Sequence, residues 1–176
     1  GYTDCALKHG ARKVFALDVG YGQLDWTLRN DPRVVNIERT NIRYFDPGQL
    51  EELVDIVTID VAFISTARVF PVIQAGIKNT GQVISLIKPQ FEAGRDKIGK
   101  KGVVKDKKVH KQVLEDSIKN ANQAGLFCSN MTWSPIKGPQ GNIEYFILLS
   151  KEHDNLNGLE NWIENTVETA HQKLGV

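Results

Sequence analysis

The sequence predicts an α/β protein with a doubly wound, mostly parallel sheet whose last strand is antiparallel. Short apolar runs alternate along the 176 residues with longer stretches of helical periodicity. The last two apolar runs instead follow each other across a short connection, which suits an antiparallel pair. With 41% hydrophobic and 24% charged residues, the chain has the composition of one globular domain.

Each predicted strand is a compact apolar run of the kind that is buried on both faces of a parallel sheet. The strands expected to alternate with helices are residues 14–18, 34–37, 54–60 and 82–88. Two more, near residues 126–133 and 144–149, are separated by 134–142, where prolines and glycines favour a hairpin loop over a helix.

Three helices are predicted from caps and apolar spacing. Asp106 precedes a stretch of helical periodicity that a glycine ends. Residues 63–78 form a second predicted helix, closed by Gly81, in which Pro71 marks a kink or the first turn. The stretch from Leu159 carries its apolar residues on one stripe, which predicts a helix docked on the sheet.

Composition and charge exclude several classes of protein. The 22 basic residues nearly balance the 21 acidic ones, which excludes a basic tail or an acidic disordered segment. No charged-then-apolar signal pattern opens the printed sequence, and no apolar run is near the roughly 18 residues of a membrane span, so we expect a cytoplasmic protein. Cys5 and Cys128 lie far apart without ligand spacing, so we expect no disulfide and no metal site.

Ionisable residues stand at the ends of three predicted strands. Ligands of open α/β sheets bind outside the carboxyl ends of the strands, and Asp60 and Lys88 end neighbouring strands. Glu144 opens the last strand, so an antiparallel course brings it to the same edge. We therefore expect these three side chains to form one cluster, with a structural salt bridge as the alternative.

Two further features suggest ligands. Asp18 ends the first strand, where an acid can accept hydrogen bonds from a ribose diol or can cap the following glycine turn; both interpretations stay open. The segment from Arg95 to Lys111 contains eight basic residues and only two acidic ones. A basic, glycine-containing rim suits a phosphate backbone, although a solvated loop gives the same pattern. The candidate RNA-binding residues are Arg95, Lys97, Lys100, Lys101 and Lys105.

The element order resembles a class I methyltransferase, and particular motifs resemble the TlyA family, which is named for haemolysin A and related to FtsJ-type ribose methyltransferases. The motifs cover residues 1–5, 16–24, 38–43, 59–65, 87–95 and 138–144. The most specific are Lys-Pro-Gln-Phe-Glu at 88–92 and Gly-Asn-Ile-Glu at 141–144. The resemblance implies 2′-O-methylation of cytidine ribose in ribosomal RNA or ribosomal subunits, with S-adenosylmethionine (SAM) as cofactor and without a metal or a membrane.

The resemblance also assigns roles to residues. Asp60, Lys88 and Glu144 match the last three members of a Lys-Asp-Lys-Glu tetrad, in which Lys88 is the base that the two acids orient. A lysine acts as a base only when neutral, whereas neighbouring carboxylates favour its charged form and a nearby cation disfavours it. Asp18 would hold the SAM ribose, and residues around Asn41 and Asp60 would flank the adenine and methionine portions. Val19, next to Asp18, is a further cofactor-binding residue.

The resemblance implies a domain organisation as well. The first strand, the glycine-rich loop, the first tetrad lysine and an S4-like RNA-binding domain are expected upstream of Gly1, with residues 1–176 as the methyltransferase domain. Three alternative functions stay open. They are methylation of a small molecule by the same chemistry, a membrane-active haemolysin, for which we find no suitable amphipathic helix, and a non-catalytic RNA-binding module.

Overall fold

The computed structural model describes residues 1–99, 101–153 and 158–175. The chain divides into two compact units, Gly1–Pro47 and Gly48–Val176, each with its own sheet. The described strands thus lie in two sheets, one in each unit.

The first unit is built on two parallel strands, β1 (Val14–Leu17) and β2 (Val34–Ile37). Its helices are α1 (Tyr2–Lys8), which the sequence reasoning missed, and α2 (Trp26–Arg29). The loops that follow the two strands are joined, because the Thr40 amide donates to the Asp18 carbonyl at 3.0 Å. Residues that follow β1 and β2 therefore lie together at the carboxyl end of this sheet.

The second unit contains a mixed sheet of four strands in the order β3-β4-β6-β5. These are β3 (Val54–Ile59), β4 (Ile77–Ile87), β5 (Phe127–Trp133) and β6 (Tyr145–Ser150). β3 and β4 are parallel, whereas β6 is antiparallel to both β4 and β5. The predicted antiparallel end of the sheet is thus confirmed.

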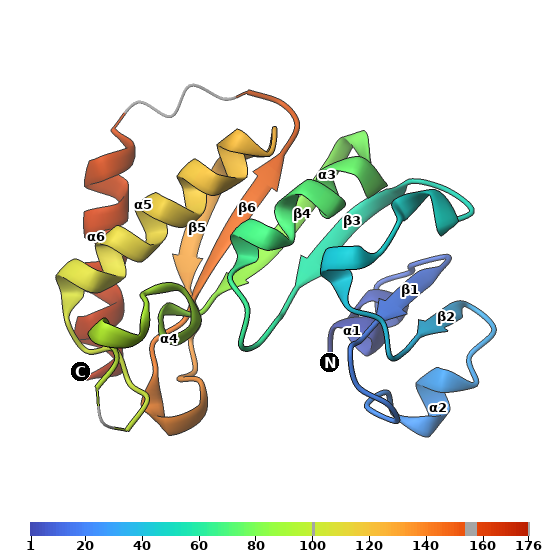
Figure 1. Cartoon of the computed structure of the whole chain (residues 1–176), viewed down its shortest axis with the longest axis horizontal. Coiled ribbons are helices and arrows are strands. Elements are labelled where there is room, and N and C mark those ends of the chain that lie inside the picture. The colour runs from blue at the N-terminus through green and yellow to red at the C-terminus, as the bar shows by residue number, and fades with distance from the viewer. Residues whose placement is uncertain (100, 154–157, 176) are drawn as a thin grey trace. The chain divides into compact units, whose positions relative to one another are not determined.

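The helices of this unit are α3 (Phe70–Gly76), α4 (Pro89–Glu92), α5 (Lys107–Gln123) and α6 (Leu159–Leu174). α5 begins as predicted, with the Asp106 carboxylate accepting the Lys108 amide at 2.8 Å, a cap that contributes about 1 kcal/mol. α5 and α6 pack against each other and against β5 (Figure 1). No helix among the described residues has the length and apolar character needed to cross a membrane.

The predicted helix over 63–78 is wrong at both ends. The helix begins at Phe70, with Pro71 in its first turn, and residues from Ile77 onward form β4. Ile77 is fully buried and pairs with Val54, and the register then shifts before the next pair. Its side chain occupies the space where a Cβ on Gly81 would lie, so the predicted helix stop is a bulge within the strand.

The core lies on one face of the second sheet. Alternate residues of β4 and β6 are buried, namely Val83, Ser85 and Ile87 and Tyr145, Ile147 and Leu149. On the opposite face Ile56 and Ile84 are exposed. The prediction that both faces are covered is therefore wrong for β3 and β4 within the described residues. β3 also has a hydrogen-bonded neighbour on one edge only, among the strands that the structure describes.

Candidate active site

Lys88 and Asp60 form an ion pair at the carboxyl ends of two parallel strands. Asp60 directly follows β3 and Lys88 directly follows β4, and Lys88 Nζ lies 2.6 Å from Asp60 Oδ1. The Lys88 side chain is 15% exposed and that of Asp60 is 42% exposed. The amine is thus largely buried, while the carboxylate that holds it is open to solvent and to a ligand.

Glu144 lies at the same edge of the sheet. The last pair of the β4–β6 ladder joins Ile87 to Tyr145, so Lys88 and Glu144 stand just beyond it on neighbouring strands. Glu144 is 6% exposed, and its Oε1 accepts a hydrogen bond from Gln90 Nε2 at 2.9 Å. The structure therefore gathers the three predicted residues at one edge, where Glu144 bonds to Gln90 rather than to Lys88.

Glu92 holds the loop that carries Asp60. One carboxylate oxygen of Glu92 accepts from Ser65 Oγ at 2.6 Å, and the other accepts from the Thr66 amide at 2.8 Å and Thr66 Oγ1 at 2.9 Å. Ser65 and Thr66 belong to the loop after β3. In the Lys-Pro-Gln-Phe-Glu segment, the first, third and fifth side chains thus contact Asp60, Glu144 and this loop, respectively. Five consecutive residues therefore hold three parts of the site together.

Phe63 is a surface residue that the sequence reasoning placed at the start of a helix. It lies instead in the loop after β3, with φ of +61° and 91% of its surface exposed. Its ring lies 4.9 Å from that of Phe91, which in turn lies 5.9 Å from Lys88 Nζ. The two rings offer a stacking surface for a flat ligand beside the amine. Its neighbours Ala62 and Ile64 are apolar, so the sequence gives no signal for an exposed ring at this position.

The basic segment follows this site along the chain. Its described candidate residues are exposed, namely Arg95, Lys97, Lys101 and Lys105. Lys100 lies outside the described residues. The middle of the segment is fixed by Asn142, whose Nδ2 donates to the Gly102 carbonyl at 3.0 Å and whose Oδ1 accepts the Val104 amide at 3.1 Å. The Gly-Asn-Ile-Glu motif thereby anchors the basic segment next to Glu144.

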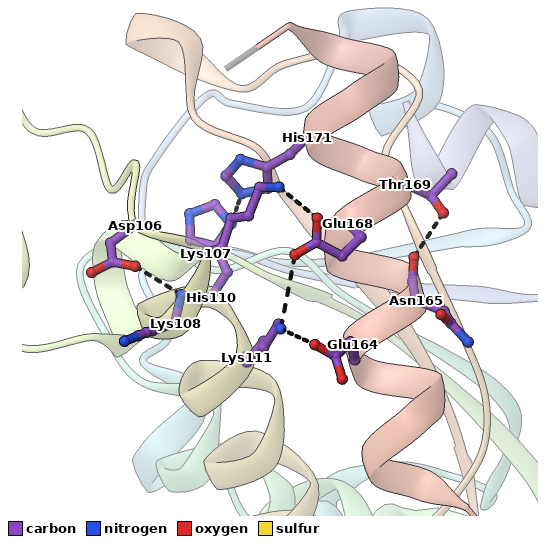
Figure 2. A network of polar contacts seen from close by, with 10 residues as sticks. All are labelled: Asp106, Lys107, Lys108, His110, Lys111, Glu164, Asn165, Glu168, Thr169 and His171. Carbon is purple, nitrogen blue, oxygen red and sulfur yellow. Dashed lines mark hydrogen bonds and ion pairs between the residues drawn. The ribbon is translucent and has the colours of Figure 1, made fainter.

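Lysines at the start of α5 are paired with acids of α6 (Figure 2). Lys107 Nζ lies 2.5 Å from Glu168 Oε2, and Lys111 Nζ lies 2.5 Å from Glu164 Oε1. Glu168 is also 3.8 Å from Lys111. These two lysines contribute to the basic character of the sequence segment, but their charge is balanced locally.

His110 connects the basic segment to the core. Its Nε2 donates to the Val104 carbonyl at 2.9 Å, and its Nδ1 lies 2.7 Å from the Tyr145 hydroxyl and 3.2 Å from His171 Nε2. A carbonyl only accepts, so the ring proton is on Nε2 and Nδ1 accepts from Tyr145. Burial lowers the pKa of His110 to about 4, which keeps the ring neutral at pH 7.

The predicted cofactor residues of the first unit lie at the carboxyl end of its sheet. Asp18 Oδ1 accepts the Gly20 amide at 2.6 Å, as the capping interpretation predicts. Its other oxygen has no hydrogen-bond partner among the described residues, so ribose binding and capping are compatible. Asn41 Oδ1 accepts the Arg43 amide at 3.1 Å, and Val19 is exposed beside Asp18. A free carboxylate oxygen next to an exposed apolar side chain fits an adenosine group.

A cavity of about 300 Å³ lies on the α5 side of the Glu92 carboxylate. Its lining includes Ser65, Ser117 and Asn120 but not Lys88, Asp60 or Glu144. Among the described residues there is no cluster of three His, Cys, Asp or Glu side chains that could hold a metal ion.

Comparison with known proteins identifies the family. Residues 1–151 match the FtsJ-like methyltransferase family. The chain is 39% identical over 170 residues to the 16S/23S rRNA (cytidine-2'-O)-methyltransferase TlyA of Mycobacterium tuberculosis, covering 95% of the chain and 63% of that protein. A hemolysin-named structure from Streptococcus thermophilus has a TM-score of 0.93 at 39% identity, covering 99% of the chain and 63% of that protein.

A more distant structure shows the fold alone. It is a Listeria monocytogenes protein named as an S-adenosylmethionine-dependent methyltransferase, with a TM-score of 0.58 at 16% identity over 85% of the chain and 84% of that protein. The mixed sheet with its antiparallel end agrees with the class I methyltransferase fold that the sequence predicts. The chain spans just under two thirds of the length of the TlyA relative. By the extent of its family match, the chain belongs to the FtsJ-like methyltransferases.

Proposed function

We propose that the protein methylates the ribose 2′-oxygen of cytidine in ribosomal RNA with SAM as methyl donor. Family membership and the activity named for the Mycobacterium tuberculosis relative support this. The observation that carries the proposal is the Lys88–Asp60 ion pair at 2.6 Å, with the buried Glu144 carboxylate one strand away. This group of residues can hold a hydroxyl and remove its proton.

In this mechanism Lys88 is the base. When bound, SAM supplies an electrophilic methyl group. Lys88 Nζ accepts the proton of the 2′-hydroxyl, for which the amine must first be neutral. Asp60 holds Nζ in place, and its exposure to solvent offers a route by which the lysine proton leaves between turnovers. Glu144 orients the hydroxyl toward the amine and does not itself take the proton.

Asp18 is the proposed ribose contact for the cofactor. Its oxygen that does not cap the Gly20 amide accepts from a SAM ribose hydroxyl. Val19 and Asn41 contact the adenine portion, because both lie at the same end of the β1–β2 sheet. Asp60 flanks the methionine portion.

The proposed RNA contacts are the basic segment and the aromatic pair. Arg95, Lys97, Lys101 and Lys105 contact phosphates, and Lys100 is assigned with them from the sequence. Phe63 stacks on the exposed base, since unpaired bases are commonly held by aromatic side chains. The partner is ribosomal RNA or a ribosomal subunit, so the expected site of action is the cytoplasm.

We also propose that the full-length protein supplies a further strand beside β3, a glycine-rich loop, the first tetrad lysine and an S4-like RNA-binding domain, all upstream of residue 1. Among the described strands β3 has one hydrogen-bonded neighbour, β4, and Ile56 on β3 is exposed. Both observations support a further strand beside β3 and a further element that covers this face of the sheet. The greater length of the relatives supports an additional domain.

The test is to locate the methyl group. Full-length protein is incubated with labelled SAM and with free ribosomal RNA or isolated subunits, and the RNA is then hydrolysed in alkali. Methylation of the 2′-oxygen blocks cleavage of the adjacent phosphodiester, so the label is expected in an alkali-resistant dinucleotide that begins with cytidine. Label on a base, or on a small molecule and not on RNA, would overturn the proposal.

A further inference from the structure

Two buried side-chain amides lie close to the candidate active site, and their hydrogen bonding differs. Asn142 is fully engaged, because both its Nδ2 and its Oδ1 bond to the chain at Gly102 and Val104. Gln90 is 9% exposed and uses only its nitrogen, which donates to Glu144. Gln90 Oε1 is buried and has no partner among the described residues.

The half-satisfied amide is unfavourable for folding. A buried carbonyl oxygen without a donor loses its hydration and gains nothing in return. The orientation is dictated by the partner, because an ionised carboxylate accepts only and therefore turns the amide nitrogen toward itself. Two apolar side chains in these positions would avoid the cost, so packing alone does not explain the pair.

The surroundings of Glu144 are shaped around its carboxylate. A Cβ on Gly138 would overlap Glu144 Oε1, so glycine at this position leaves room for the oxygen that Gln90 contacts. Gln90 itself lies in α4, two residues after Lys88, and the next alternate side chain, Glu92, fixes the loop of Asp60. Gln90 thus joins the lysine segment to the Glu144 strand.

We propose that Gln90 is a positioning residue for methyl transfer, which holds the ionised Glu144 carboxylate in place beside Lys88. This inference rests on the proposed function and extends it to a residue that does not touch the reacting atoms. Its effect on the reaction passes through Glu144 alone.

The test replaces Gln90 with methionine, which has a similar length but no amide. In full-length Gln90→Met, kcat is expected to fall about 10- to 100-fold with an unchanged KM for RNA, because small displacements of reacting groups cost rate.

A double-mutant cycle separates positioning from a structural role. In the Glu144→Gln background, Gln90→Met is expected to cause no further loss of kcat. The apolar pair Gln90→Met with Glu144→Leu is expected to melt at or above the temperature of the unmodified protein, whereas the control Asn142→Leu melts lower. Additive losses in the cycle, or a lower melting temperature of the apolar pair, would overturn the inference.

The controls also keep the inference distinct from the proposed function. If Lys88→Ala abolishes transfer and Glu144→Gln lowers kcat to a level that is still measurable, while Gln90→Met keeps full activity, only the role of Gln90 is wrong. If Lys88→Ala is fully active, the proposed function itself fails.

Discussion

Two lysine–carboxylate clusters in the second unit share their chemistry and differ in their surroundings. Lys111 lies between Glu164 and Glu168 of α6, in a group of partly exposed charges on two packed helices (Figure 2). Lys88 pairs with Asp60 at strand ends, beside a buried carboxylate and an exposed aromatic ring. An ion pair alone therefore does not mark a site, since surface pairs typically contribute only about 0–1 kcal/mol to stability.

The clusters also differ in what they leave unsatisfied. Around Lys111 each charge meets an opposite charge on the neighbouring helix. Around Lys88, Gln90 keeps a buried oxygen that has no donor in the described part of the chain, and Phe63 adopts a left-handed conformation at the surface. Such features oppose stability, and they persist most often where function requires them.

The largest expected effect compares the two lysines directly. Lys88→Met removes the proposed base and is expected to reduce methyl transfer about 100- to 10,000-fold, the range typical of a lost general base. Lys111→Met, which removes only a helix–helix ion pair, is expected to change it less than about twofold. Transfer of labelled methyl groups to ribosomal RNA measures both. Comparable rates for the two variants would erase the distinction between the clusters.

His110, which precedes Lys111 in α5 and lies against His171 of α6, is expected to control stability in acid. The pKa of His110 in the folded protein, about 4, lies below the ordinary 6.5. The neutral ring therefore contributes its full share to the free energy of unfolding above pH 6.5, and this share is lost as pH falls toward 4. The expected loss is about 3 kcal/mol. Urea unfolding at pH 7 and pH 4 measures it, with His110→Gln as the neutral control. The same pH dependence in both proteins would contradict the assignment.

Acidic residues provide the next comparison. Glu92→Gln replaces a carboxylate that accepts three hydrogen bonds, so the free energy of unfolding is expected to fall by about 1–3 kcal/mol. Glu164→Gln breaks a surface pair and is expected to cost less than about 1 kcal/mol. Urea denaturation at pH 7 checks the order. A larger loss in the Glu164 variant would reverse our view of which cluster is structurally critical.

The smallest expected effect concerns RNA affinity. Lys97→Ala removes an exposed charge and is expected to lower the slope of log K against log salt by about 0.7–0.9. Lys107→Ala is expected to lower it less, because Glu168 already neutralises that lysine. Filter binding of ribosomal RNA at several salt concentrations distinguishes them. Equal slopes in the two variants would remove the basis for separating loop lysines from helix lysines.

The sequence predicts the edge at which Asp60, Lys88 and Glu144 meet, because strand direction fixes which ends of neighbouring strands coincide. It does not predict the Gln90–Glu144 bond, which joins residues 54 positions apart and depends on side-chain orientation. It also misplaces Phe63, because Phe63 itself adopts the left-handed conformation without being a glycine. A short 3-10 helix, Thr66–Arg68, then separates it from α3.

A crystal structure of the full-length protein with S-adenosylhomocysteine is the most direct measurement of the central claim, that Lys88, Asp60 and Glu144 form the methyl-transfer centre. Our account predicts that the sulfur faces Lys88 Nζ across a space wide enough for a ribose hydroxyl, with Gln90 still bonded to Glu144. A ligand bound elsewhere, or a Lys88 side chain directed away from the sulfur, would contradict it.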